Sequence, residues 1–201
     1  RLPGENLLYL GDTARLPYGT KSRDTIIRYT LKAAGRLVDE GVKMLVVACN
    51  TITVLGKDVI QNGYDFSVIG MAKGARMVKG VTKNKRVGFV ATDFTVSTGA
   101  HKREIQAMDP EIQVFGQGCP KFVPLIEGEK FGTPELASAV QEYADDLKAH
   151  DVDTVLLACT HYPFVREELQ KALGSQVTIL DPAERTTQDA IEDLAARGLA
   201  Q

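Results

Sequence analysis

The sequence predicts an α/β protein built from two pseudo-symmetric halves with parallel sheets. Short apolar runs alternate with stretches of helical periodicity along the whole chain. The runs are continuously apolar and rich in β-branched residues, as in strands that are covered on both faces. One of these segments recurs 110 residues later in the chain. Because open α/β sheets bind ligands at the carboxyl ends of their strands, we expect an active-site cleft between the halves.

The strands and helices follow from the order of these runs. Strands are expected at residues 7–10, 44–48, 66–69, 87–91, 112–115, 154–158 and 177–180. A stripe of apolar residues with a 3.6-residue period predicts a helix over residues 22–40. A second helix is expected over residues 133–150, because Thr133 is a candidate cap and Pro134 suits a first helical position.

The repeat divides the chain. Residues 37–51, LVDEGVKMLVVACNT, align without a gap with residues 147–161, LKAHDVDTVLLACTH. We therefore expect a first half over residues 1–80 and a second half over residues 81–182, with a polar boundary near residues 79–85. The second half opens with an extra strand 25 residues before the strand at Ile112, and the first half has no counterpart. A strand, loop and helix are thus expected before residue 1, and residues 183–201 could complete the first half.

Composition excludes several classes of partner. The chain has 24 Lys and Arg against 26 Asp and Glu, a formal net charge of −2, which argues against binding to nucleic acid or to an anionic membrane. No apolar run approaches the roughly 20 residues of a membrane span. Three cysteines cannot form a disulfide framework, and they suit a reducing cytoplasm.

Cys49 and Cys159 are the leading candidates for catalysis. Both follow the end of an expected parallel strand, and the repeat relates them. A helix N-terminus after each thiol would favour a thiolate and a carboxylate ligand. Two opposed thiols suit the inversion of a stereocentre, because one removes a proton and the other returns one to the opposite face. The alternative is inert packing, which is the usual role of a buried free cysteine; Cys119, which has no repeat partner, is interpreted as a turn residue.

Other polar residues lie near these strand ends. His161 could assist Cys159, or it could simply begin a helix in contact with solvent. Glu127 could point into the cleft, or it could be a solvated loop acid. Thr92 and Thr95 could donate hydroxyl groups to a carboxylate. No nucleotide-binding glycine motif and no zinc-type cysteine spacing is found, so no cofactor and no metal is expected.

Five stretches carry a resemblance to a known family. They are GDTARLPYG at 11–19, ACNT at 48–51, FVATDFTVSTGAH at 89–101, GCPKFVPLIE at 118–127 and ACTHYP at 158–163. In these stretches the chain resembles the glutamate racemases of the cofactor-independent aspartate/glutamate racemase superfamily. The resemblance implies a cytoplasmic isomerase, expected as a homodimer, that interconverts L- and D-glutamate and supplies D-glutamate for peptidoglycan, the cell wall and cell shape.

The resemblance also implies site residues. Cys49 and Cys159 would be the acid/base thiols, the first acting on D-glutamate and the second on L-glutamate, with His161 and Glu127 assisting the second. The substrate would be held by Pro17, Tyr18, Gly19, Asn50, Thr51, Thr92, Thr95 and Thr160. The family's opening Asp-Ser-Gly segment has no match in this chain. Two alternatives therefore stay open, a homologue with a binding or regulatory role and a related carbon-acid enzyme such as an aspartate racemase.

Overall fold

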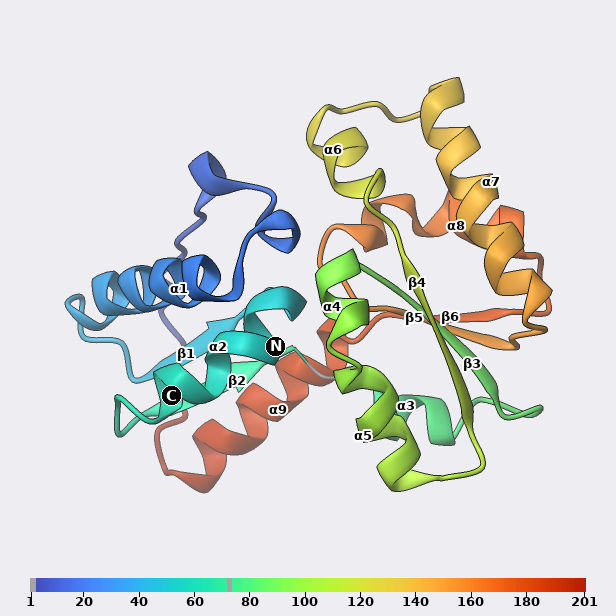
Figure 1. Cartoon of the computed structure of the whole chain (residues 1–201). Helices are drawn as coiled ribbons and strands as arrows, with labels where there is room; N and C mark the ends of the chain where they lie inside the picture. The colour runs from blue at the N-terminus through green and yellow to red at the C-terminus, as the bar shows by residue number, and fades with distance from the viewer. Residues whose placement is uncertain (1–2, 72–73) are drawn as a thin grey trace. The chain divides into compact units, whose positions relative to one another are not determined.

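The chain divides into two compact units, each an α/β assembly with parallel strands (Figure 1). The computed structural model describes residues 3–71 and 74–201. One unit takes in Arg1–Ala72 and Ala183–Gln201, and the other takes in Lys73–Pro182. The predicted fold class is thereby confirmed. No helix among the described residues has the length and apolar character needed to cross a bilayer.

The first unit holds a two-stranded sheet between helices. Its strands β1 (Met44–Val47) and β2 (Ser67–Gly70) pair in parallel, with Met44 opposite Ser67. Its helices are α1 (Arg23–Val38), α2 (Asn50–Gln61) and α9 (Ala183–Ala196). The apolar core combines side chains of α1, β1, α2 and β2, namely Ala34, Leu45, Val47, Ile60 and Val68. Helix α9 packs beside β2, so residues far apart in sequence build one unit.

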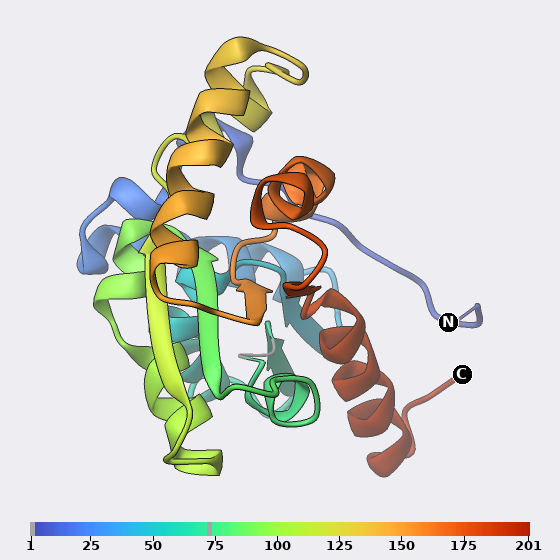
Figure 2. The same cartoon turned by 90° about the vertical axis from the view of Figure 1, so that its right-hand side faces the viewer.

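The expected strand at residues 7–10 is wrong. This segment is extended but belongs to no ladder, and Leu7 and Tyr9 are 92% and 88% exposed. A strand requires a neighbour for its backbone N–H and C=O groups, and in the described chain β1 pairs with β2 alone. The Glu5 carboxylate instead lies 2.8 Å from Lys43 Nζ and accepts a 2.8 Å hydrogen bond from the backbone N–H of Gln201. In Figure 2 the segment that follows α9 runs toward the N-terminal segment.

The second unit is a three-layer α/β/α structure. Its sheet has the order β4 (Gln113–Gly118), β3 (Arg86–Ala91), β5 (Thr154–Leu157) and β6 (Thr178–Leu180), with every pair parallel. Val90 and Val155 face a core shared with α6 (Phe122–Glu127), α7 (Pro134–Ala149) and α8 (Arg166–Leu173). Phe89 and Leu156 face the opposite core, shared with α3 (Ala75–Lys79) and α5 (Ala100–Met108).

Two features connect this fold with the sequence pattern. The 110-residue offset relates β1 to β5 residue for residue, from Met44 to Thr154 and from Val47 to Leu157. Helix α7 begins as expected, because the Thr133 hydroxyl accepts a hydrogen bond from the backbone N–H of Leu136 and Pro134 follows the cap. The division between units falls between residues 72 and 73 rather than at 80, because α3 packs against α5 of the second unit.

Asp153 ties the turn before β3 to the start of β5. Its carboxylate accepts hydrogen bonds from the Thr82 hydroxyl at 2.7 Å and from the backbone N–H groups of Lys83 and Asn84 at 2.6 and 2.8 Å. Burial alone would raise the pKa of Asp153, but these hydrogen bonds outweigh it and hold the pKa below its ordinary value.

We therefore predict that Asp153→Asn lowers the free energy of unfolding at pH 7 by about 1–3 kcal/mol. A carboxyl whose pKa is depressed in the folded state stabilises the fold above its unfolded pKa of about 3.9, and this contribution disappears as the pH falls through the folded pKa. Urea unfolding at pH 7 and pH 3 should show the difference from wild type shrinking at the lower pH. Asp146→Asn, on an exposed face of α7, is the control, and an equal loss at both pH values would contradict the prediction.

Candidate functional site

Cys49 lies at the point where β1 leads into α2. It is the N-cap residue of α2, and its carbonyl oxygen accepts a 2.8 Å hydrogen bond from the backbone N–H of Thr53. Burial raises the pKa of the Cys49 thiol, and the backbone N–H groups of Ile52 and Thr51 and the Thr51 side chain act in the opposite direction. The net shift is upward, so Cys49 rests as a thiol, while the helix N-terminus can stabilise the thiolate once it forms.

Asn50 and Thr51 follow Cys49 in the first turn of α2, and both are buried to 3% exposure. Neither side-chain amide atom of Asn50, Oδ1 or Nδ2, has a hydrogen-bond partner within the part of the chain that the structure describes. An unpaired buried amide costs about 1–3 kcal/mol, so such a group in a native structure requires an explanation. A ligand that bonds both atoms would supply one.

Pro17, Tyr18 and Gly19 form a turn that contacts α2. Tyr18 begins a short 3₁₀ helix, Tyr18–Thr20, which contacts α2. The Tyr18 side chain is buried. The Tyr18 hydroxyl donates a hydrogen bond to Oδ2 of Asp12. Burial, followed by this hydrogen bond, raises the pKa of Tyr18. The first unit thus brings Cys49, Asn50, Thr51 and the 17–19 turn together around the start of α2.

In the second unit, three strand ends carry Thr92, Cys119 and Cys159. Thr92 caps α4 (Asp93–Ser97), accepting from the backbone N–H of Thr95 at 3.4 Å and donating to the Thr95 hydroxyl at 3.1 Å. Because β4, β3 and β5 are neighbours with parallel register, the residues that follow them lie at one edge of the sheet. Cys159 and Thr160, both half-buried, directly follow β5 and Ala158 at this edge.

The structure pairs His161 with Glu127, two residues that are 34 positions apart. His161 Nε2 lies 2.6 Å from Glu127 Oε1, at the last residue of α6. The carboxylate can orient the imidazole two residues after Cys159, and an oriented imidazole can assist proton transfer. The helix expected after Cys159 begins as a 3₁₀ helix over Tyr162–Val165, with His161 as its N-cap and Pro163 in its first turn, and α8 follows it.

The sequence did not reveal that Tyr162, three residues after Cys159, is hydrogen-bonded to Cys119. Tyr162 is completely buried, and its hydroxyl donates to the carbonyl oxygen of Cys119 at 3.1 Å. Burial is the main cause that raises the pKa of the Tyr162 phenol, so it stays neutral. Cys119 is also fully buried, with its Sγ 3.6 Å from the Gln117 carbonyl oxygen, and burial raises the pKa of its thiol. Cys119 is enclosed, whereas Cys49 and Cys159 are half-buried, and an enclosed thiol is poorly placed to exchange a proton with a substrate.

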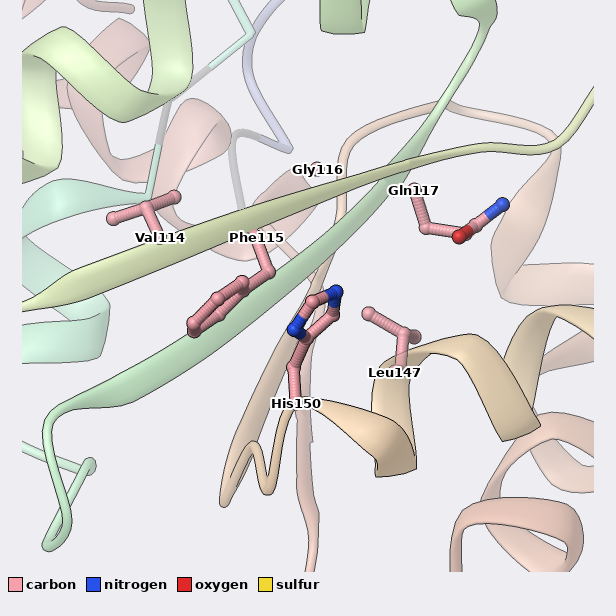
Figure 3. Close-up of a pocket in the computed structure, with 6 residues that line it drawn as sticks. All are labelled: Val114, Phe115, Gly116, Gln117, Leu147 and His150. Carbon is pink, nitrogen blue, oxygen red and sulfur yellow. The ribbon is translucent and has the colours of Figure 1, made fainter.

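A separate hollow of about 270 Å³ lies beside β4 and the end of α7. It is lined by Val114, Phe115, Gly116, Gln117, Leu147 and His150. Figure 3 shows the His150 imidazole facing the ring of Phe115, and the two rings are stacked with centroids 4.3 Å apart. None of the candidate site residues lines this hollow. The described residues also contain no group of three or more His, Cys, Asp or Glu side chains that could hold a metal ion.

Known proteins resemble this chain in sequence over almost its whole length. The model of the Asp/Glu/Hydantoin racemase family matches residues 2–190, and the chain belongs to this family. Within it, the glutamate racemase of Geobacter metallireducens is 40% identical over 195 residues, 96% of this chain and 72% of that relative. The resemblance to glutamate racemases expected from the sequence is thereby confirmed.

Solved structures agree with this assignment. A glutamate racemase isoform from Bacillus anthracis has a TM-score of 0.93 at 30% identity, over 100% of this chain and 76% of that one. The glutamate racemase of Francisella tularensis in complex with D-glutamate has a TM-score of 0.91 at 32% identity, over 100% of this chain and 75% of that one. Relatives of this kind therefore share both the sequence and the fold of the chain.

Proposed function

We propose that this chain racemises glutamate, with Cys49 and Cys159 as the two acid/base thiols. The observation that carries the proposal is the start of α2, where a thiol and a buried, unpaired Asn50 amide lie on consecutive residues. Its relatives support the substrate, because they are glutamate racemases and one of them is in complex with D-glutamate.

The unpaired Asn50 amide matches the chemistry of an amino acid. Nδ2 donates and Oδ1 accepts, so the two atoms complement a carboxylate and an ammonium group. An amino acid carries both groups on its Cα atom, so one ligand can satisfy both atoms of Asn50. The N-terminus of α2 adds a positive partial charge that favours the carboxylate.

The proposed reaction needs two proton transfers. One thiolate takes the Cα proton and becomes a thiol, which leaves a carbanion; the other thiol then gives its proton to the opposite face and becomes a thiolate. The raised pKa of Cys49 suits the donor in the L-to-D direction, because the resting group already carries its proton. Thr92, Thr95 and Thr160 are proposed to hold the substrate with Pro17, Tyr18 and Gly19, and His161, held by Glu127, to assist Cys159.

The test is turnover of L-glutamate and of L-aspartate, in separate assays, by the 201-residue chain. Circular dichroism measures the loss of the L-enantiomer over time. We expect the signal to decay to zero with glutamate and to stay constant with aspartate. Decay with aspartate alone would favour the related carbon-acid enzyme. Binding of glutamate without decay would favour a regulatory protein, and either result would overturn the proposal.

We place the activity in the cytoplasm, in the supply of D-glutamate to peptidoglycan. Three free thiols suit a reducing compartment. The homodimer stays a prediction, which light scattering of the purified chain can test.

A further inference from the structure

The loop before α1 contains an ion pair that the proposed mechanism does not use. Arg15 Nη1 lies 2.8 and 2.9 Å from the two carboxylate oxygens of Asp12, so one cation bonds both of them. The Asp12 side chain is 15% exposed, while the Arg15 side chain is 37% exposed. Asp12 also accepts a hydrogen bond from the hydroxyl of Tyr18, the buried residue of the 17–19 turn. The Asp12 carboxylate therefore links Arg15 to this turn.

The same arginine anchors the loop to α1. Its guanidinium carbon lies 4.7 Å from the centroid of the Tyr29 ring, a cation–π distance. Tyr18 meets Tyr29 edge to face, with centroids 6.2 Å apart. In Figure 1 the loop is the dark blue segment beside α1. Arg15, Asp12, Tyr18 and Tyr29 therefore form one contiguous cluster, which we call the loop clamp.

The loop clamp ends at the candidate site. The short helix Tyr18–Thr20 contacts α2, the helix that Cys49 caps. The Cys49 thiol is also close enough to contribute to the raised pKa of Tyr18. The turn is stiffened locally, because the Thr20 hydroxyl donates to the Pro17 carbonyl oxygen at 3.1 Å. A shift of Tyr18 would therefore displace the backbone of Pro17 and Gly19 at the start of α2.

We infer that Arg15 is a positioning residue, which acts through Asp12 and Tyr18 to hold the 17–19 turn in place for the substrate. This role rests on the proposed function. If Arg15 is removed, a mostly buried carboxylate loses its paired cation and keeps only the more remote charge of Lys21 and the hydrogen bond from the neutral Tyr18 hydroxyl. The carboxylate then moves toward solvent and draws the Tyr18 hydroxyl with it.

The test compares Arg15→Met with Arg28→Met in the full chain. Arg28 is exposed and lies over the same Tyr29 ring, at 5.3 Å, so it is a matched control. We expect Arg15→Met to raise KM about tenfold for both enantiomers and to change kcat less than threefold, because the turn binds substrate and transition state alike. Arg28→Met should leave KM unchanged.

Two further variants separate positioning from stability. Arg15→Lys keeps the charge but loses the planar guanidinium that lies over the Tyr29 ring, so it should give an intermediate KM. The double variant Asp12→Asn with Arg15→Met removes the unpaired charge and should restore part of the lost affinity. An unchanged KM in Arg15→Met, or equal effects of Arg15→Met and Arg28→Met, would overturn the inference while wild-type turnover still supports the proposed function. A wild-type chain that does not turn over glutamate would overturn both.

Discussion

Cys49→Ala and Cys159→Ala are each expected to lower kcat/KM for glutamate racemisation by about 10²–10⁴-fold, the range that a positioned acid or base contributes. One thiol removes the Cα proton and the other protonates the opposite face of the same carbon, so neither can replace the other. The measurement is circular dichroism, starting from each pure enantiomer. Cys119→Ala is the matched control, because this thiol is fully buried while Cys49 and Cys159 are partly exposed, and its kcat/KM should stay within about threefold of wild type.

A second measurement on these variants assigns each thiol to one face. The equilibrium constant between enantiomers is unity, so kcat/KM must fall equally in both directions and cannot reveal the assignment. Hydrogen exchange at Cα can, because a single thiol can remove and return a proton on one face without inversion. In D₂O, Cys159→Ala should incorporate deuterium faster into D-glutamate, and Cys49→Ala faster into L-glutamate. The same preferred enantiomer in both variants, or wild-type racemisation in either, would contradict the two-thiol mechanism.

The second large effect is expected at the pair of His161 and Glu127. His161→Asn should lower kcat/KM by about 10²-fold, because it removes the group that can assist proton transfer at Cys159. Glu127→Gln should cost less, since its carboxylate acts through the imidazole 2.6 Å away. The two losses should not add in the double variant, because residues in direct contact are coupled. A double-mutant cycle on kcat/KM measures this coupling.

The control for this pair is His150→Asn. His150 stacks on Phe115 and lines the hollow at β4, whose lining includes neither His161 nor Glu127. We expect it to retain the racemisation rate of the wild type. Additive losses for His161 and Glu127 would show that they act separately and would contradict the positioning role of the carboxylate.

The core of the second unit shows what local pattern predicts well. Continuous apolar runs mark β3 and β5 because both strands are covered on both faces, and Thr133 with Pro134 marks the start of α7 because capping depends on neighbouring residues. The repeat places Cys49 and Cys159 after equivalent strands for the same reason. Each of these predictions depends on residues within one element or its immediate flanks.

The segment at residues 7–10 shows where such reasoning fails. Its apolar residues suit a strand, but a strand exists only with a hydrogen-bonded neighbour, which no local pattern can supply. The sequence by itself determined the α/β class, the strand-end thiols and the family to which the chain belongs. Only the tertiary structure decided that Glu127 meets His161 and that Asp12 joins Arg15 to a buried Tyr18. The physical reason is that side-chain partners are chosen by how the chain folds back on itself, and spacing along the sequence does not encode that contact.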